Sequence, residues 1–329
     1  MTAAPLGERC TIEVHLDADD LSAALRRDAL DGLTAYPKHL PPKWFYDERG
    51  SLLFDDITRL EEYYPTRRET EILQREAALI AARTGATTLL ELGSGTSTKT
   101  KLLLDALAAA GTLTHIVPFD VCEPILREAG PALAARYPGV QVDTVVGDFE
   151  RHLGRLQMGD HTLVALLGGT IGNFTPPERA KFLHELADQM RPGDWLLLGT
   201  DLVKDPTRLV AAYDDAGGVT ADFNRNVLRV LNRELGGTFV PERFAHVARW
   251  DPDEQWIEMH LRSLSDQTVW LGVLDLDIDV AEGELIRTEI SAKFTRGRLE
   301  GELTAAGLDL DQVLTDSADD FAVSLSVKP

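Results

Sequence analysis

The sequence has little cysteine and little positive charge, and each shortage excludes a class of protein. Only Cys10 and Cys122 occur in 329 residues, far apart, so neither a disulfide framework nor a cysteine zinc site is indicated. Lys and Arg total 33 against 54 for Asp and Glu, which gives a net charge of -21. Such a charge repels phosphate backbones and anionic lipid surfaces, so we expect neither a nucleic-acid nor a membrane partner.

Long apolar runs and metal-binding patterns are also lacking. No stretch approaches the roughly 20 apolar residues of a membrane span, and the N-terminal segment lacks the apolar run of a signal peptide. The eight histidines show no HxH or HExxH pairing, so we expect no metal. A soluble protein in a reducing, cytoplasmic setting is expected, and we expect it to be a monomer.

The middle of the chain alternates short apolar runs with helical patterns, which is typical of βαβ units and a parallel sheet. Strands are predicted at 87–92, 115–121, 140–149, 161–173 and 195–202. Helices are predicted between them at 98–110, 123–137 and 176–190. The chain then closes with a predicted helix at 298–307 and strands at 310–316 and 321–328. A terminal antiparallel hairpin is typical of class I methyltransferases, whereas a dinucleotide-binding dehydrogenase continues with a parallel sixth strand.

Between the fifth strand and the last helix lies a segment of different character. Helices are predicted at 205–216 and 219–235, and period-2 alternation predicts antiparallel strands at 256–264, 268–280 and 285–294. We therefore predict an α/β, Rossmann-like class I methyltransferase fold with an inserted α+β substrate-binding domain. The predicted domains are 68–201 with 293–329 for the methyl donor, and 15–67 with 202–292 for the substrate.

The segment ELGSGTSTKT, residues 91–100, opens a helix with a glycine turn that could hold three different cofactors. A Walker phosphate loop and a dinucleotide fingerprint would each need glycine where Thr98 stands. The third interpretation is the acidic turn of a methyltransferase that uses S-adenosylmethionine (SAM). The turn alone does not decide among them.

Acidic residues at three successive strand ends favour SAM over NAD. Glu91 would repel a pyrophosphate but suits the cationic amino end of SAM. Asp120 can accept both ribose hydroxyls, and Asp148 can accept a proton from the adenine amino group while Phe149 packs on the ring. Each acid alone is more often a turn or cap residue, but together on one sheet edge they predict a SAM site.

The fourth strand is followed by LLGGTIGNF, residues 166–174. Methyltransferases place the residues nearest the transferred methyl group here. Gly168 and Gly169 would let a substrate approach the sulfonium, and Asn173 supplies both a donor and an acceptor. A plain Gly/Asn turn is the alternative.

Two further segments supply candidate substrate contacts. Residues 41–69 are rich in aromatics, and the hydroxyls of Tyr46, Tyr63 and Tyr64 must find partners if buried, so a lid or substrate wall is plausible. In TEISAKF the two-residue period puts Glu289 and Ser291 on one face, where they could grip a small ring with one N–H donor and one nitrogen acceptor. A core-packing role and a solvated strand face are the respective alternatives.

Nine segments together resemble one family: PPKWFYD, EYYPTR, ELGSGTSTKT, PFDV, GDFE, TIGNFTP, GTDLVKD, YDDAGGVTADFNRNVL and TEISAKF. They are similar to the SAM-dependent L-histidine Nα-methyltransferases of ergothioneine biosynthesis, of actinobacterial type, from about residue 20 to the C-terminus. The resemblance implies that three methyl groups pass from SAM to the histidine α-amino group, giving hercynine and S-adenosylhomocysteine (SAH). It also implies a substrate domain built from the N-terminal segment and the insertion.

The same resemblance implies a set of site residues. SAM contacts fall on Tyr46, Gly93, Lys99, Asp120, Asp148, Phe149 and Gly168. Histidine contacts fall on Tyr63, Asn173, Tyr213, Met259, Glu289 and Ser291. Within these sets Tyr46 and Asn173 are the implied catalytic residues: Tyr46 would accommodate the methylammonium, and Asn173 with Tyr213 would hold the carboxylate and orient the amine. Tyr63, Glu289 and Ser291 would hydrogen-bond the imidazole.

One position departs from the family and three other functions compete. Gly169 stands where relatives often have Ser, which puts a minor contact near Thr170 in doubt. For Met259, packing in the hydrophobic core is the ordinary interpretation. A methyltransferase for another amino acid such as tryptophan, an NAD-dependent oxidoreductase and a non-catalytic SAM-binding protein are the alternatives.

Overall fold

The computed structural model describes residues 4–16, 18–95, 97, 99–156 and 158–329, and the chain divides into two compact units. The first unit comprises Met1–Leu16, Pro65–Val203 and Phe294–Pro329, and the second comprises Asp17–Tyr64 and Lys204–Lys293. The limits expected from the sequence differ from these by at most three residues. Residues 15 and 16, for example, were expected in the second unit and belong to the first. Which ligand each unit binds stays a prediction.

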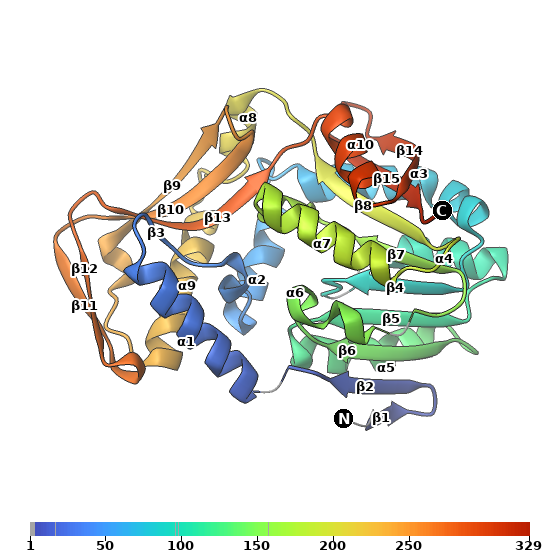
Figure 1. Ribbon diagram of the computed structural model, residues 1–329, viewed down its shortest axis with the longest axis horizontal. Helices are drawn as coiled ribbons and strands as arrows, with labels where there is room; N and C mark the ends of the chain where they lie inside the picture. The colour runs from blue at the N-terminus through green and yellow to red at the C-terminus, as the bar shows by residue number, and fades with distance from the viewer. Residues whose placement is uncertain (1–3, 17, 96, 98, 157) are drawn as a thin grey trace. The chain divides into compact units, whose positions relative to one another are not determined.

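A nine-stranded sheet forms the centre of the first unit, in the order β1-β2-β6-β5-β4-β7-β8-β15-β14 (Figure 1). Its strands are β1 (Ala4–Gly7), β2 (Cys10–Val14), β4 (Thr88–Leu92), β5 (His115–Asp120), β6 (Gln141–Val146), β7 (Thr162–Leu166), β8 (Trp195–Asp201), β14 (Asp309–Thr315) and β15 (Phe321–Val327). The strands from β2 to β8 are parallel, and β15 is antiparallel to both β8 and β14. This order, closed by an antiparallel hairpin, is the class I methyltransferase fold that the sequence predicted.

Helices cover both faces of this sheet. They are α3 (Pro65–Thr84), α4 (Thr100–Ala110), α5 (Glu123–Arg136), α6 (Phe149–His152), α7 (Pro176–Gln189) and α10 (Arg296–Ala305). Helices α3, α4 and α5 lie behind the sheet in Figure 1, and α7 and α10 lie in front of it. The central strands β4 and β7 are buried along their whole length, as continuous apolar strands between two helical layers must be.

The two N-terminal strands were not predicted from the sequence. They form a short antiparallel hairpin, and β2 extends the sheet by pairing in parallel with β6. Strands of four and five residues offer too few positions for a period to stand out, so their pairing depends on β6 rather than on a local pattern.

The second unit is an α+β layer structure. Its helices are α1 (Ala18–Thr34), α2 (Glu48–Ile57), α8 (Pro206–Ala211) and α9 (Val219–Leu235). Its strands are β3 (Lys38–His39), β9 (Phe244–Asp251), β10 (Trp256–Ser263), β11 (Gln267–Leu271), β12 (Leu276–Val280) and β13 (Leu285–Ala292). One sheet has the order β3-β13-β10-β9, and β11 pairs with β12 separately. The apolar face of α9 provides much of the core, including Val227, Leu228 and Leu231.

The prediction of one strand over 268–280 was wrong. The segment forms the hairpin β11–β12, which turns through a short 3-10 helix, Gly272–Leu274, and Asp275. Asp275 has φ 50°, a left-handed conformation that aspartate tolerates, and the glycine of GVLD stands at 272 rather than at this position. Because this hairpin stands apart, β10 pairs directly with β13.

The described residues offer neither a membrane-spanning helix nor a cluster of metal ligands. None of the helices among them is both long enough and apolar enough to cross a membrane. They likewise contain no group of three or more His, Cys, Asp or Glu side chains placed to hold a metal ion.

Candidate active site

The glycine turn after β4 is fastened to the end of β5. The backbone N–H groups of Gly93 and Ser94 donate to Phe119 O at 2.8 and 3.0 Å. Asp120 Oδ2 accepts from Gly95 N at 2.8 Å, and its Oδ1 accepts from Cys122 N at 2.9 Å. Gly93 and Gly95 have φ of 70° and 48°, which favours glycine at both. Burial raises the pKa of Asp120 despite these bonds, and its carboxylate keeps lone pairs for a ligand.

Several buried polar atoms around this turn lack partners. Glu91 accepts from the Thr100 hydroxyl, while its Oε2 has no hydrogen-bond partner among the described residues. Ser94 Oγ and Ser97 Oγ likewise have no hydrogen-bond partner among the described residues. Burial raises the pKa of Glu91 to about 8. Buried polar groups are normally satisfied, so these atoms mark a place that a polar ligand would complete.

The third strand end carries Asp148 and Phe149 side by side. Asp148 is buried, and its backbone N–H donates to His152 Nδ1 at 3.0 Å. Burial also lowers the pKa of His152, which keeps that acceptor neutral. The Phe149 ring meets Phe182 edge-on with centroids 5.6 Å apart. These contacts fix the Asp148 backbone and the Phe149 ring, and the adenine contact stays a prediction.

Lys99 and Gly168 share a partner that no motif marked. Glu69 of α3 is fully buried, and its carboxylate accepts from Gly168 N at 2.8 and 3.0 Å and from the Lys99 ammonium. Gly199 of β8 leaves room for it, because a Cβ at that position would lie 2.2 Å from Glu69 Oε1. The signal for Glu69 is its place on the buried face of α3, one turn before Ile72.

The loop after β7 is a left-handed turn that leads into a 3-10 helix, Thr170–Asn173. Gly168 and Gly169 have φ of 78° and 72°, so a serine at 169 would be strained in this conformation. Asn173 ends the short helix with its side chain half-buried. Next to it, the fully buried Arg179 donates to Phe174 O at 2.9 Å and fixes the end of the loop.

In the second unit, four of the predicted histidine contacts lie close together. Met259 of β10 stands directly opposite Glu289 of β13 in the antiparallel ladder, and Ile257 stands opposite Ser291. Opposite residues share a sheet face, so Glu289 and Ser291 lie on the same face as Met259. The hydroxyls of Ser291 and Tyr213 are 2.7 Å apart and hydrogen-bonded. The pairing that period 2 predicted is therefore present.

The predicted tyrosines surround this group with aromatic contacts. The buried Tyr63 ring meets the Tyr213 ring edge-on, with centroids 6.1 Å apart. Tyr46 lies at the end of the 3-10 helix Pro42–Phe45 and meets Phe54 and Phe223 edge-on, each at 5.5 Å. Tyr46 remains half-buried, which leaves part of its ring accessible.

A polar hydrogen-bond network contacts the backbone carbonyls of Tyr213 and Met259. His246 Nε2 lies 2.7 Å from Tyr213 O, and its Nδ1 lies 2.8 Å from Asn224 Nδ2. The carbonyl needs a donor, so Nε2 carries the proton and Nδ1 accepts. Thr288 donates to Asn224 Oδ1 at 2.7 Å and lies 3.1 Å from Met259 O. Burial lowers the pKa of His246, which keeps this arrangement neutral.

Glu289 is an acid whose ionisation is finely balanced. Burial raises its pKa to about 7, and the positive charge of Lys293 acts in the opposite direction. Lys293 is a second residue that no motif marked, although the two-residue period from Glu289 through Ser291 reaches it in one further step. A ligand that donates an N–H to the Glu289 carboxylate would therefore favour its ionised form.

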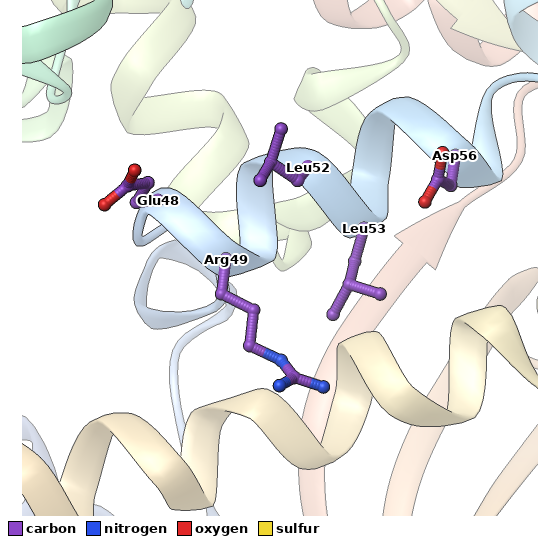
Figure 2. Close-up of a pocket in the computed structure, with 5 residues that line it drawn as sticks. All are labelled: Glu48, Arg49, Leu52, Leu53 and Asp56. Atoms are coloured by element: carbon purple, nitrogen blue, oxygen red, sulfur yellow. The ribbon is translucent and has the colours of Figure 1, made fainter.

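Two surface hollows among the described residues lie away from the predicted site residues. One, of about 310 Å³, is lined by five side chains of α2, which are Glu48, Arg49, Leu52, Leu53 and Asp56. Figure 2 shows Arg49 and Leu53 on one side of that helix and Leu52 on the other, so the feature belongs to the helix surface.

Comparisons with known proteins agree on one family. The family model described as histidine-specific methyltransferase, SAM-dependent, matches residues 25–328. A histidine N-alpha-methyltransferase of Mycolicibacterium smegmatis is 56% identical over 95% of this chain and 98% of its own. One of Mycobacterium tuberculosis is 54% identical over 97% of this chain and all of its own. Ergothioneine biosynthesis protein 1 of Neurospora crassa is 30% identical over 92% of this chain, which spans 34% of that protein.

Proposed function

Because the chain belongs to the family of histidine-specific, SAM-dependent methyltransferases, we propose that it transfers three methyl groups to the α-amino group of L-histidine. The product is hercynine, and the place of the reaction is ergothioneine biosynthesis, in line with the name of the Neurospora relative. Family membership also sets aside the NAD-dependent oxidoreductase. The observation that supports this most directly is that Glu289, Ser291 and Met259 share one sheet face, with the Tyr213 hydroxyl bonded to Ser291.

The first unit offers the groups that SAM requires. Once bound, SAM supplies a methyl group on a positively charged sulfonium carbon. Glu91 Oε2 can accept from the amino group of its methionine end, and Lys99 can pair with the carboxylate there. Gly93 lets the backbone of the turn approach that end closely. Asp120 can accept from the ribose hydroxyls.

The remaining proposed SAM contacts lie at the adenine and at the methyl group. Asp148 can accept from the adenine amino group while Phe149 packs on the ring. Gly168, which has no side chain, leaves the methyl group accessible.

The second unit offers a site for histidine that reads both ring nitrogens. Glu289 accepts an imidazole N–H, and the Ser291 hydroxyl donates to the other nitrogen. Tyr63 closes the ring pocket, and Met259 packs on its apolar edge. A site built to hydrogen-bond a ring rejects an analogue that leaves those groups unpaired, by a factor of about 10⁴ to 10⁵ in comparable enzymes.

The amine end needs positioning more than covalent chemistry, because methyl transfer is an in-line displacement. We assign the carboxylate and the orientation of the amine to Asn173 and Tyr213, as the resemblance implies. The amine must be neutral to attack, so each round releases one proton. The face of Tyr46 attracts the methylammonium that grows with each round.

The test is incubation with SAM and a panel of amino acids, followed by mass spectrometry. We expect histidine to gain three methyl groups and tryptophan to gain none. A methylated tryptophan, or no trimethylated histidine, would overturn the proposal. Detectable turnover also excludes a non-catalytic SAM-binding protein. Size-exclusion chromatography with light scattering checks the expected monomer.

A further inference from the structure

Lys293 is a fully buried lysine beside two of the proposed histidine contacts. Its ammonium donates to Tyr213 Oη at 2.9 Å and to Ser291 Oγ at 2.8 Å. It also lies 4.6 Å from the centroid of the Tyr213 ring, within the range of a cation–π contact. Burying an ammonium costs free energy unless it is well paired, so a purely apolar residue would pack here more cheaply. The charge therefore calls for an explanation beyond packing.

The ammonium determines the polarity of the two hydroxyls. An ammonium has only donors, so both oxygens must accept from it. Each hydroxyl keeps one hydrogen, and the 2.7 Å contact between Tyr213 and Ser291 uses one of the two. The other hydrogen is directed to an acceptor outside this group of three. The hydroxyl pair is thereby arranged to act as a donor, next to the acceptor Glu289.

The backbone keeps Lys293 in this position. Its N–H donates to Gln255 O at 2.8 Å, in the turn before β10, so the lysine continues the ladder in which Ser291 faces Ile257. Glu289, Ser291 and Lys293 follow one another at the two-residue period of a strand. The result is a row that reads acceptor, hydroxyl, cation.

We propose that Lys293 is a positioning residue for the amino-acid substrate, which holds the Tyr213 and Ser291 hydroxyls as acceptors so that the pair presents one hydrogen beside Glu289. This inference rests on the proposed function, because it requires histidine to bind at that row. It assigns the lysine a role in substrate selection without contact to the reacting atoms. It also explains why a buried cation is present on a face that otherwise packs apolar side chains.

The electrostatic consequence gives a readout that packing alone would not change. Burial raises the pKa of Glu289 and the Lys293 charge lowers it, so removing that charge must raise the pKa further. Near this row, Tyr63 meets the Tyr213 ring edge-on, and the neutral His246 bonds to Tyr213 O and lies 3.9 Å from Asp214. Glu258 and His260 alternate with Met259 along β10 and belong to its other face. Lys293 is therefore the residue to change.

The experiment titrates histidine into protein saturated with SAH, over a range of pH, by calorimetry. Lys293→Met keeps most of the length of the side chain and removes the charge and donors, while Lys293→Arg keeps the charge. We expect Lys293→Met to weaken histidine binding at least about tenfold, the size of one lost charged hydrogen bond. Histidine affinity should rise with pH as Glu289 ionises, and in Lys293→Met this rise should occur at higher pH. Lys293→Arg should recover part of both effects, and SAH affinity should stay within about twofold.

Three results would overturn the inference. They are an unchanged histidine affinity in Lys293→Met, an unchanged pH profile, or an equal loss of SAH affinity, which would indicate a general structural role. If Lys293→Met does not fold, Lys293→Gln keeps a donor without the charge and tests the same pH shift. Failure of the unmodified protein to bind histidine would instead refute the proposed function, so the two failures are distinguishable.

Discussion

The two units hold their polar groups in different ways. In the first unit the acids Glu91, Asp120 and Asp148 come from three different strand ends, and Asp120 is fixed by backbone N–H groups. In the second unit Glu289, Ser291 and Lys293 come from one strand, and the two hydroxyl contacts of the lysine are side chain to side chain. Sheet topology alone sets the first arrangement, whereas the second depends on which side chains pack over one strand. We therefore expect the proposed donor site to follow from the fold, and the proposed substrate site to follow from the side chains on one strand face.

The largest expected effect is on the donor side. Asp120→Ala removes the anchor of the glycine turn and the proposed ribose acceptor together. We expect SAH affinity to fall about 100-fold or more, the sum of two charged hydrogen bonds. Calorimetry with SAH measures it, with Glu128→Ala on the exposed side of α5 as the matched control. A loss below about threefold would show that the turn does not hold the ligand.

The next effect should be confined to the substrate side. Glu289→Ala removes the proposed imidazole acceptor, so histidine binding should weaken by roughly 1 to 3 kcal/mol while SAH binding is unchanged. Histidine is titrated into SAH-saturated protein, and Asp277→Ala on the exposed strand β12 serves as control. Equal losses for both ligands would break the contrast between the units.

A smaller effect is expected at Glu69. Glu69→Gln keeps an acceptor for the Gly168 N–H but loses the charge that pairs with Lys99. SAH affinity should fall about tenfold, since one charge-assisted bond is weakened. Glu76→Gln, two turns further along α3, is the control. A fall in histidine affinity without a fall in SAH affinity would contradict this assignment.

The smallest effect is a proton count. Glu91 has its pKa raised to about 8, so it is mostly protonated at pH 7 when no ligand is bound. The ammonium of SAM favours the ionised form, so binding at pH 7 should release part of one proton, and the release should shrink as pH rises past about 8. Calorimetry in buffers of different ionisation enthalpy measures it, and Glu91→Gln should abolish it. Proton uptake would contradict the proposed contact.

The same acid affects stability in a definite direction. Its folded pKa lies above the ordinary value of 4.5, so the contribution of protonated Glu91 to stability is present in acid and is lost as pH rises towards 8. Bound SAM offsets that loss.

The comparison of units also explains what the sequence could predict. The strands from β4 to β8 and the closing hairpin were predicted because apolar runs and turns recur at regular spacing. The strand-end acids followed from that topology. Glu69 could not be recognised, because its partners Lys99 and Gly168 lie 30 and 99 residues away and only packing brings them together. Lys293 lay one step beyond a pattern already visible, yet only the structure shows that its charge is buried.

Segments without a local signal account for the remaining differences. The strand β2 is fixed by its pairing with β6, and the left-handed position of the β11–β12 turn is Asp275 rather than a glycine. In both places tertiary contacts override weak local preference.

The central claim is that one strand face of the second unit reads the two ring nitrogens of histidine. The most direct measurement is the ratio of kcat/KM for histidine to that for phenylalanine, and the same ratio for each of the two ring-N-methylated histidines. We predict a preference of at least about 10⁴ over phenylalanine and a strong loss for both methylated rings, because each leaves a buried polar group unpaired. A histidine-to-phenylalanine ratio near one would contradict the account. Turnover of the ring-methylated histidines as fast as that of histidine would also contradict it.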